Sequence, residues 1–269
     1  MGKIALLVLI AFAEACAFAN DNLDYGIPKA DSVVDRIGYA LGYSEEHEQA
    51  AWVMYRLTRE EVLTKAAKRT DDFREDPNIP TFSALPSDYS HSGFDRGHLA
   101  PAEDMKFSDV TMQESFYMSN MSPQRPEFNR GIWKKLEKQV RRFAYNEGSV
   151  FVITGPILER NLKKIGNANK VSVPRYFYKV VYDETPPHKM IAFVLPNEGS
   201  DKPVADYVTS VDEVERRTGL DFFRWDKRRV DVGGGDRFFG VEFKVAAFGE
   251  MTLPLGLKTR LRTRRENML

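Results

Sequence analysis

The chain has almost no cysteine and few histidines, which narrows the chemistry open to it. Cys16 is the only cysteine among 269 residues, and it lies in an N-terminal stretch that we predict to be removed. The mature chain is therefore expected to form no disulfide, use no thiol nucleophile and hold no cysteine-ligated zinc. The four histidines include no HxxxH or HxH pair, which disfavours a histidine-rich metal site. Oxygen ligands remain for any metal ion.

The chain also lacks a net charge and any division into modules. Lys and Arg together number 39, as do Asp and Glu. A partner that is a polyanion would therefore need a locally basic surface. No internal repeat, low-complexity tract or Pro/Ser-rich linker interrupts the sequence. With 42% hydrophobic residues, the sequence predicts a single domain with a full core.

A continuous apolar run stands at the N-terminus, over residues 4–13, and Ala17-Phe18-Ala19 forms a small-x-small pattern after it. About ten apolar residues are too few for a membrane-spanning helix, which needs ~20. We therefore interpret residues 1–19 as a secretory signal peptide and residues 20–269 as one mature domain. The expected location is secreted or periplasmic, without stable membrane association.

The residues that carry chemistry are concentrated in a short central segment. Three polar clusters follow one another there: Asp95-Arg96-Gly97-His98, Ser119-Asn120-Met121-Ser122-Pro123-Gln124 and Phe128-Asn129-Arg130-Gly131. A neutral imidazole can accept a proton from water near pH 7. Carboxamide oxygens suit a hard cation such as Mg²⁺, which keeps several waters and needs few protein ligands. The segment therefore predicts metal-assisted hydrolysis of a phosphodiester.

Residues 130–143 have the pattern of an amphipathic helix with a basic outer face. The apolar arc of roughly 100° contains Ile132, Trp133, Leu136, Val140 and Phe143. The cationic arc of roughly 140° contains Arg130, Lys134, Lys135, Lys138, Arg141 and Arg142. The distal cations are equally consistent with a solvated face. Arg130 and Lys134 lie nearest the polar clusters and are the candidate phosphate contacts.

The rest of the pattern predicts an α+β fold. Apolar, β-branched or aromatic runs bounded by Gly, Pro or Asn predict strands over residues 51–57, 150–154, 173–182 and 190–195. Ser108 begins a predicted helix over residues 108–116, and Ser210 opens another that ends at Gly219. We expect a mostly antiparallel central sheet with flanking helices.

Residues 92–137 closely resemble the DNA/RNA non-specific endonucleases, a family that includes secreted bacterial nucleases and mitochondrial endonuclease G. The resemblance rests on the Asp-Arg-Gly-His string, the Ser-Asn-x-x-Pro-Gln string and the Asn-x-x-x-Trp helix, which occur in the family's order and approximate spacing. It covers roughly residues 50–225. Residues 226–269 form a C-terminal extension to which we assign no role.

The resemblance implies a ββα-metal, or His-Me finger, site, in which a hairpin carries a histidine and the following helix carries the metal ligand. On this correspondence His98 is the general base and Asn129 holds a single, largely hydrated Mg²⁺, with Mn²⁺ as a substitute. Asn120 is expected to hold the transition state or the metal's waters, and Glu137 to hydrogen-bond those waters. The alternatives are a core histidine held by Asp95 and, at Asn129, a plain helix N-cap.

Two arginines are expected to neutralise the charge that grows on the phosphoryl oxygens in the transition state. Arg96 belongs to the motif itself, whereas an ion pair with a neighbouring glutamate would explain Arg56 almost as well. The expected substrate-binding side chains are Arg130, Lys134 and Gln124.

The resemblance and these residues predict a secreted, Mg²⁺-dependent endonuclease that cuts DNA and RNA and leaves 5′-phosphates. Two alternatives stay open: a catalytically silent nucleic-acid-binding protein on the same scaffold, and an exported nuclease toxin with an inhibitor or immunity protein. The intact set of site residues argues against the first. The resembling family includes monomers and dimers, so a homodimer stays open as well.

Overall fold

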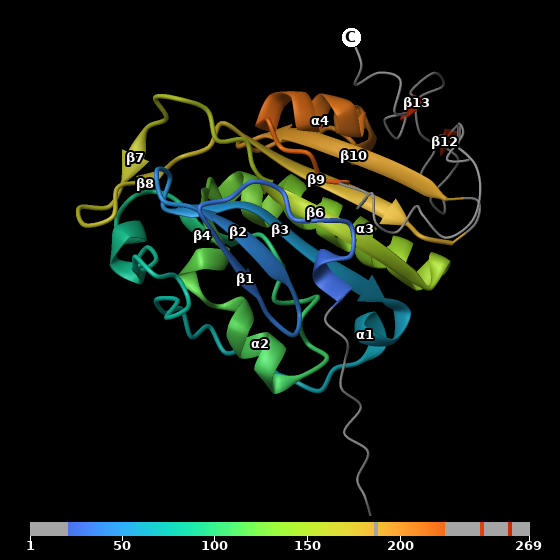
Figure 1. The fold of residues 1–269 in the computed structure, drawn as a ribbon, viewed down its shortest axis with the longest axis horizontal. Coiled ribbons are helices and arrows are strands. Elements are labelled where there is room, and N and C mark those ends of the chain that lie inside the picture. The colour runs from blue at the N-terminus through green and yellow to red at the C-terminus, as the bar shows by residue number, and fades with distance from the viewer. Residues whose placement is uncertain (1–20, 186–187, 224–242, 245–257, 260–269) are drawn as a thin grey trace, which may run out of the picture.

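An antiparallel sheet of seven strands forms the centre of the fold in the computed structural model, which describes residues 21–185, 188–223, 243–244 and 258–259 (Figure 1). In spatial order the strands are β1 (Ser32–Asp35), β2 (Ala40–Ser44), β3 (Gln49–Thr58), β6 (Ser149–Pro156), β9 (Tyr176–Asp183), β10 (Lys189–Pro196) and β11 (Val208–Thr209). Each neighbouring pair is antiparallel. The predicted α+β class with a mostly antiparallel sheet is confirmed.

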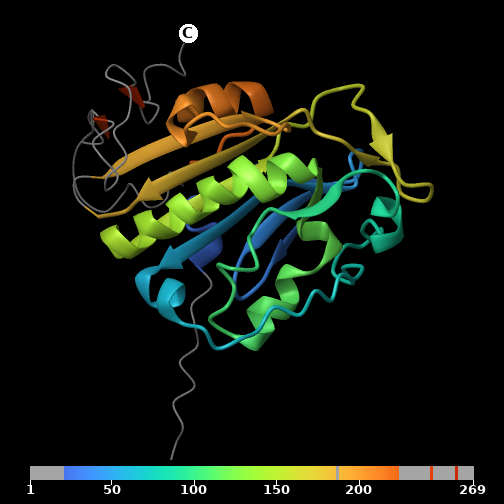
Figure 2. The ribbon, with the colours of Figure 1, turned by 180° about the vertical axis from the view of Figure 1, so that it is seen from behind.

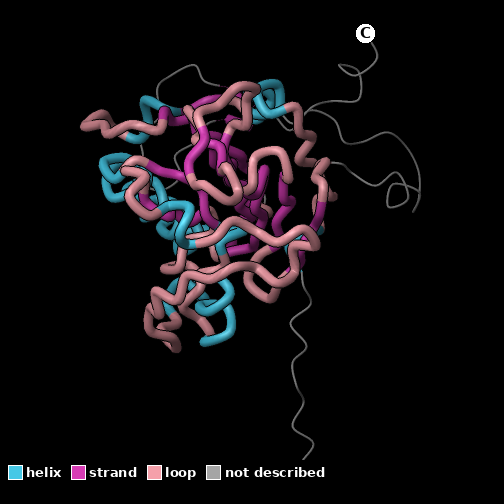
Figure 3. Tube along the Cα trace, turned by 90° about the vertical axis from the view of Figure 1, so that its left-hand side faces the viewer, coloured by secondary structure: helices cyan, strands magenta, loops and turns pink. Residues whose placement is uncertain are grey.

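Helices cover both faces of this sheet (Figures 1 and 2). The α-helices are α1 (Arg59–Leu63), α2 (Asp109–Ser115), α3 (Lys134–Glu147) and α4 (Val211–Thr218). Short 3₁₀ turns are η1 (Asp21–Leu23), η2 (Pro86–Tyr89), η3 (Met118–Asn120) and η5 (Val204–Tyr207), and the wider turn η4 (Phe128–Trp133) precedes α3. Figure 3 shows the strands at the centre with helices around them.

The sheet is buried on both sides because its strands alternate between two apolar layers. On β3, Val53, Tyr55 and Leu57 belong to the layer that contains the apolar side of α3. Trp52 and Met54 belong to the opposite layer, which contains the buried residues of α4. In this part of β3, odd-numbered residues therefore face α3 and even-numbered residues face the layer that contains α4.

The predicted helices have the expected caps. The Ser108 side chain accepts from the backbone N–H of Thr111 at the start of α2. At α4 the Ser210 side chain accepts from Glu213 N, and Gly219 closes the helix in the left-handed conformation with φ of 69°. The predicted strands correspond to β3, β6, β9 and β10, although β9 begins at Tyr176 rather than at residue 173.

The three smaller sheets are two-stranded. They pair β4 (Asp95–His98) with β5 (Met121–Gln124), β7 (Lys164–Ile165) with β8 (Val171–Ser172), and β12 (Phe243–Lys244) with β13 (Lys258–Thr259). In the first pair Asp95 lies opposite Gln124, and His98 lies opposite Met121. The first two polar clusters of the sequence are thus partner strands of one hairpin.

The predicted helix over residues 130–143 is longer than expected and is broken near its start. Gly131 has φ of −103° and ψ of −109°, which kinks the chain within η4, before α3 begins. The predicted apolar stripe is buried, with Trp133 and Leu136 fully inaccessible. Arg141 differs from the prediction, because it turns inward and bonds to the buried carboxylate of Asp104 at 2.6 Å.

The predicted signal peptide and most of the C-terminal extension lie outside the described residues. Within the part that is described, no helix is both long and apolar enough to cross a membrane.

Candidate active site

His98 ends β4 and is enclosed by two aromatic rings. The centroid of its ring lies 4.9 Å from that of Phe116 and 5.7 Å from that of Phe73. Its Nε2 atom is buried and has no hydrogen-bond partner among the residues that the structure describes, although the residue as a whole is partly exposed. Burial lowers the pKa of His98 from 6.5 to about 3, and the positive charge of Arg69 acts in the same direction. The imidazole is therefore neutral near pH 7, the state in which it can accept a proton.

Asp95, at the other end of β4, fixes the side chains of Asn129 and Arg130. Asn129 donates from Nδ2 to Asp95 Oδ2 at 2.9 Å. Arg130 donates from Nε and Nη2 to the two carboxylate oxygens, at 2.9 and 2.7 Å. A carboxylate only accepts hydrogen bonds, so the amide must turn its nitrogen toward Asp95. The Oδ1 atom of Asn129 is thereby turned away from Asp95.

These contacts differ from those that the two alternatives raised by the sequence would require. Asp95 bonds to Asn129 and Arg130, so it does not hold His98 as a core histidine. Asn129 is not an N-cap, because it lies within η4 and its backbone N–H donates to the carbonyl of Arg125 at 2.9 Å.

An open cleft of about 310 Å³ lies beside these residues. Its lining consists of Arg69, Phe73, Asp95, Arg96, Asn129 and Arg130. Of its three guanidinium groups, that of Arg69 pairs with Asp71 at 2.6 Å and that of Arg130 pairs with Asp95, which leaves Arg96 as the cation that makes this surface locally positive. The Arg96 guanidinium lies 4.4 Å from the ring centroid of Phe73, and none of the carboxylates in the described ranges is paired with it. Arg96 is thus available to an anion.

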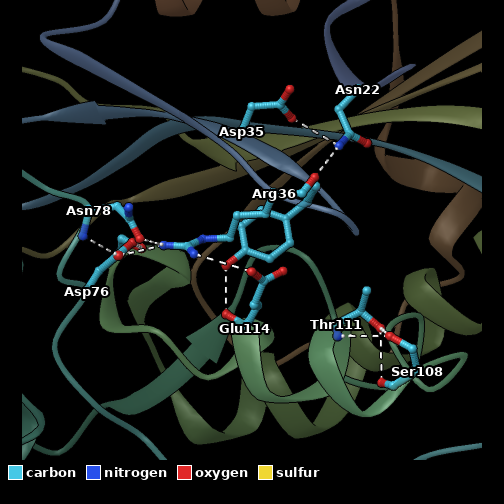
Figure 4. A network of polar contacts seen from close by, with 10 residues as sticks. Asn22, Asp35, Arg36, Asp76, Asn78, Ser108, Thr111 and Glu114 are labelled. Carbon is cyan, nitrogen blue, oxygen red and sulfur yellow. Dashed lines mark hydrogen bonds and ion pairs between the residues drawn. The ribbon is translucent and has the colours of Figure 1, made fainter. Parts of the chain in front are cut away.

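Arg69 and Phe73 were not found by sequence analysis, because they lie in an irregular segment without a motif. That segment is anchored by the buried carboxylate of Asp76, which accepts from Arg36 Nη2 at 2.5 Å and from the hydroxyl of Ser119 at 2.5 Å. Figure 4 shows the Arg36 end of this network, which also includes Asn78 and Glu114. The anchor joins the cleft to the β1–β2 hairpin.

Asn120 is fully buried, and its side-chain amide forms hydrogen bonds with backbone groups. It accepts from Ala100 N and donates to the carbonyls of Ala100 and Ser115, each at 2.9 Å. The side chain therefore positions the chain that follows His98. The geometry does not support the predicted direct contact with the transition state or with metal-bound water.

Gln124 is also fully buried and lies directly under Gly97. A Cβ atom added at Gly97 would lie 2.2 Å from Cδ of Gln124. Glycine at this position leaves the space that the Gln124 side chain occupies. The predicted contact of Gln124 with substrate is not supported, since its side chain has no access to the cleft.

Arg56 lies on the other side of the sheet. It alternates along β3 with Tyr55 and Leu57, which face α3, and so it faces away from the hairpin and η4. Its guanidinium donates to both carboxylate oxygens of Glu184 at 2.9 Å and also pairs with Asp21. The structure corrects its predicted role as an electrostatic clamp on the substrate.

The remaining predicted residues lie on α3. Lys134 is exposed on its outer face, as expected for a phosphate contact. Glu137 is half-buried, and burial raises its pKa to about 7, against the lowering effect of Lys179.

The donor set fits the expected metal. Across the described ranges, no group of three or more His, Cys, Asp or Glu side chains could form a metal cage. A single, largely hydrated Mg²⁺ needs no such cage, because waters complete its octahedron. The orientation that Asp95 imposes on Asn129 supplies the required amide oxygen at the cleft.

A histidine-bearing hairpin that meets a helix carrying an asparagine defines the ββα-metal, or His-Me finger, class. Within that class the chain belongs to the DNA/RNA non-specific endonuclease family, whose model matches residues 18–227.

Named relatives agree with this assignment. The chain is 35% identical over 217 residues to the mitochondrial nuclease EXOG of Xenopus laevis, which covers 74% of this chain and 61% of that protein. It is 33% identical over 212 residues to human mitochondrial endonuclease G, with 74% and 71% of the two chains covered. The chain thus spans about three fifths of the length of the EXOG relatives.

A solved structure shows the same fold. The crystal structure of the EndoG/EndoGI complex, which concerns the mechanism of EndoG inhibition, matches with a TM-score of 0.71 and 37% identity. The match covers 78% of this chain and 93% of that chain.

These comparisons overturn the expected secreted or periplasmic location. EXOG, endonuclease G and the Saccharomyces cerevisiae and Schizosaccharomyces pombe relatives are all named as mitochondrial nucleases. An apolar run followed by a small-x-small pattern was therefore a misleading guide to location.

Proposed function

We propose that this protein is a metal-dependent endonuclease that hydrolyses phosphodiester bonds of DNA and RNA and leaves 5′-phosphates. The observation that carries the proposal is the arrangement of a neutral His98 and an oriented Asn129 at one basic cleft. Membership of the endonuclease family supports the reaction class. Mg²⁺ is the proposed metal, with Mn²⁺ as a substitute.

In the proposed mechanism, His98 removes a proton from the water that attacks phosphorus in line with the leaving 3′ oxygen. Arg96 and Arg69 meet the phosphoryl oxygens, on which negative charge grows in the transition state. The Asn129 oxygen would hold the metal ion, which acts as a Lewis acid on the phosphate. The anionic substrate favours imidazolium, so substrate binding raises the basicity of His98 toward the range that catalysis needs.

Lack of sequence specificity follows from the same residues. Guanidinium groups at the cleft recognise phosphate, and phosphate contacts position a nucleic acid without reading its bases. Lys134, exposed on α3, and Arg130 extend this basic surface.

The names of the relatives favour a mitochondrial location for this chain. Among residues 1–19, Lys3 is the only basic residue, unlike an arginine-rich transit peptide, so import must be measured directly. Fractionation of cells that express the full chain tests it, and absence from mitochondria would contradict it. An inhibitor that covers the cleft is the proposed protein partner, because the matched crystal structure is an inhibitor complex.

Digestion of supercoiled plasmid and of RNA by the purified chain tests the function. We expect cleavage of both with Mg²⁺ or Mn²⁺, none with EDTA, and loss of cleavage in His98→Ala and Asn129→Ala. Lys138→Ala, an exposed cation on the same helix, is the matched control and should cleave normally. Binding without cleavage by the wild type would instead support a catalytically silent binding protein.

A further inference from the structure

Lys179 is a fully buried lysine in the middle of the sheet. It lies on β9, opposite Thr154 of β6 and Phe193 of β10. Its neighbours Phe177 and Val181 belong to the layer on the α3 side, so Lys179 points toward that helix. Its side chain is 0% exposed, and its Nζ atom has no hydrogen-bond partner.

The ammonium group lies 4.8 Å from the ring centroid of Trp133, at the junction of η4 and α3. A cation–π contact repays only a part of the cost of burying an ammonium group, which amounts to several kcal/mol. Lysine is almost never fully buried without a paired charge. In the described part of the chain Nζ forms no ion pair, so carboxylates at longer range must supply the balance.

Two carboxylates act on Lys179 through space, those of Glu137 and Asp104. Asp104 is already engaged, because it accepts from Arg141 at 2.6 Å and from the Tyr55 hydroxyl at 2.9 Å. Glu137, by contrast, has neither a hydrogen bond nor an ion pair to its carboxylate anywhere in the described part of the chain. Glu137 is thus the counter-charge that remains for Lys179.

The position of Glu137 connects this pair to the cleft. Asn129, Trp133 and Glu137 follow one another at four-residue intervals along η4 and α3. Lys179 contacts the ring of Trp133, the middle residue of this series. Its positive charge also attracts the carboxylate of Glu137, the last residue. A change at Lys179 can therefore reach Trp133, the residue that joins α3 to the turn carrying Asn129.

We propose that Lys179 is a positioning residue for the nuclease site: buried against Trp133 at the start of α3, it is the positive charge that faces Glu137 one turn further along that helix. This inference rests on the proposed function, because it takes Glu137 to hydrogen-bond the waters of the metal, as the family resemblance implies.

The electrostatics of the pair agree with this role. Burial lowers the pKa of Lys179 to about 8, and Glu137 opposes that shift. Burial raises the pKa of Glu137 to about 7, while Lys179, Arg141 and Lys134 lower it and Asp104 raises it further. Tyr55 on β3 is the other titratable group that interacts with Glu137. Without Lys179, Glu137 would be protonated over more of the neutral range.

Lys179→Met, made in the full chain, separates this role from packing, because methionine has a similar shape and no charge. We expect the free energy of unfolding in urea to fall, because removing one partner of a buried charge pair leaves the Glu137 carboxylate without its counter-charge. We expect nuclease activity at pH 7 to fall about 10- to 100-fold and its acidic limb to move to higher pH. Lys138→Met, on the exposed face of α3, is the control and should change neither property.

Two readouts do not depend on cleavage. In an inactive His98→Ala background, Lys179→Met should weaken Mg²⁺ binding measured by calorimetry about 10-fold or more. The ¹³C signal of the Glu137 carboxyl, followed by NMR, should titrate at higher pH in Lys179→Met than in the wild type. Both measurements can be made even if the chain is not a nuclease. Failure of this inference can therefore be distinguished from failure of the proposed function.

The proposal is overturned if Lys179→Met keeps the wild-type pH profile, Mg²⁺ affinity and Glu137 titration. If the single variant does not fold, Lys179→Met/Glu137→Gln restores the balance of charge. A folded double variant then supports the coupling of the two residues, and an unfolded one overturns it.

Discussion

The carboxylate of Asp95 and the amide of Asn129 are joined by a hydrogen bond of 2.9 Å that determines which end of the amide is left for a ligand. The same carboxylate holds Arg130 in a bidentate pair. Asp95 thus links the first residue of the hairpin to the helix and sets the orientation of the proposed metal ligand. It acts on the site without being a ligand or a base.

Asp95→Asn should therefore lower activity and Mg²⁺ affinity while the fold is retained. An asparagine at this position no longer forces the nitrogen of Asn129 toward it, and it breaks the bidentate pair with Arg130. Loss of such an outer partner costs about 10- to 100-fold in metal affinity or activity. Calorimetry and plasmid digestion measure the two effects.

Glu213→Gln is the control for that experiment, because Glu213 forms a similar bidentate pair with Arg216 on α4, away from the cleft. Equal loss of activity in both variants would show that surface ion pairs in general, and not the Asp95 contact, are responsible.

The buried His98 should make the fold sensitive to acid. Its pKa is about 3 in the folded protein and 6.5 in the unfolded chain, so the unfolded state binds more protons between these values. Stability supplied by the neutral imidazole is present above pH 6.5 and is lost as the pH falls toward 3. His98→Phe keeps a ring in the aromatic enclosure and removes this contribution.

Urea unfolding at pH 7.5 and pH 4.5 measures the effect, and the wild type should lose more stability than His98→Phe. The exposed His91 has a positive φ of 56°, which asparagine tolerates, so His91→Asn serves as the control and should behave as the wild type. The same pH dependence in His98→Phe would contradict the prediction.

Gly97→Ala should destabilise the hairpin through overpacking. The new Cβ would lie 2.2 Å from Cδ of Gln124, and such a clash costs about 1–3 kcal/mol. Gln124→Ala removes the obstructing atoms, so the double variant should recover most of the loss. Chemical denaturation of the four proteins gives the coupling free energy, and strictly additive effects would refute the packing explanation.

Substitutions at Arg56 and Arg96 should affect different properties: the first should lower stability, and the second should lower kcat. Arg56→Gln breaks the pairs with Glu184 and Asp21, which should cost roughly 1 kcal/mol of stability and leave kcat unchanged. Arg96→Gln should leave stability nearly unchanged and lower kcat about 10²- to 10³-fold, as expected for loss of a group that stabilises transition-state charge. A catalytic defect of similar size in Arg56→Gln would contradict its placement.

The sequence predicted those parts of the fold that local patterns encode. Alternating apolar runs marked the central strands, and the serines at positions 108 and 210 marked two helix starts that the structure confirms. The sequence could not show on which face of the sheet Arg56 lies. Both faces of β3 are apolar, so the pattern does not indicate which face lies at the site.

The polar residues of the motifs were harder to interpret. Asn120 and Gln124 look reactive in sequence, yet both are buried by contacts that only the folded hairpin creates. Arg69 and Phe73 reach the cleft through a segment held by the Arg36–Asp76 pair, which joins residues 40 positions apart. No local pattern can reveal such an anchor.

The pairing of β3 with β6 has a consequence for how the chain folds. This contact joins Thr58 to Ser149, so the entire hairpin, the helix α3 and the cleft belong to the loop that the contact closes. Pairings between residues so distant in sequence form slowly, because the entropy of loop closure precedes any gain from packing. A nascent chain that has not yet released β6 from the ribosome should therefore lack a formed cleft, so the proposed nuclease activity should appear only after most of the domain has been synthesised.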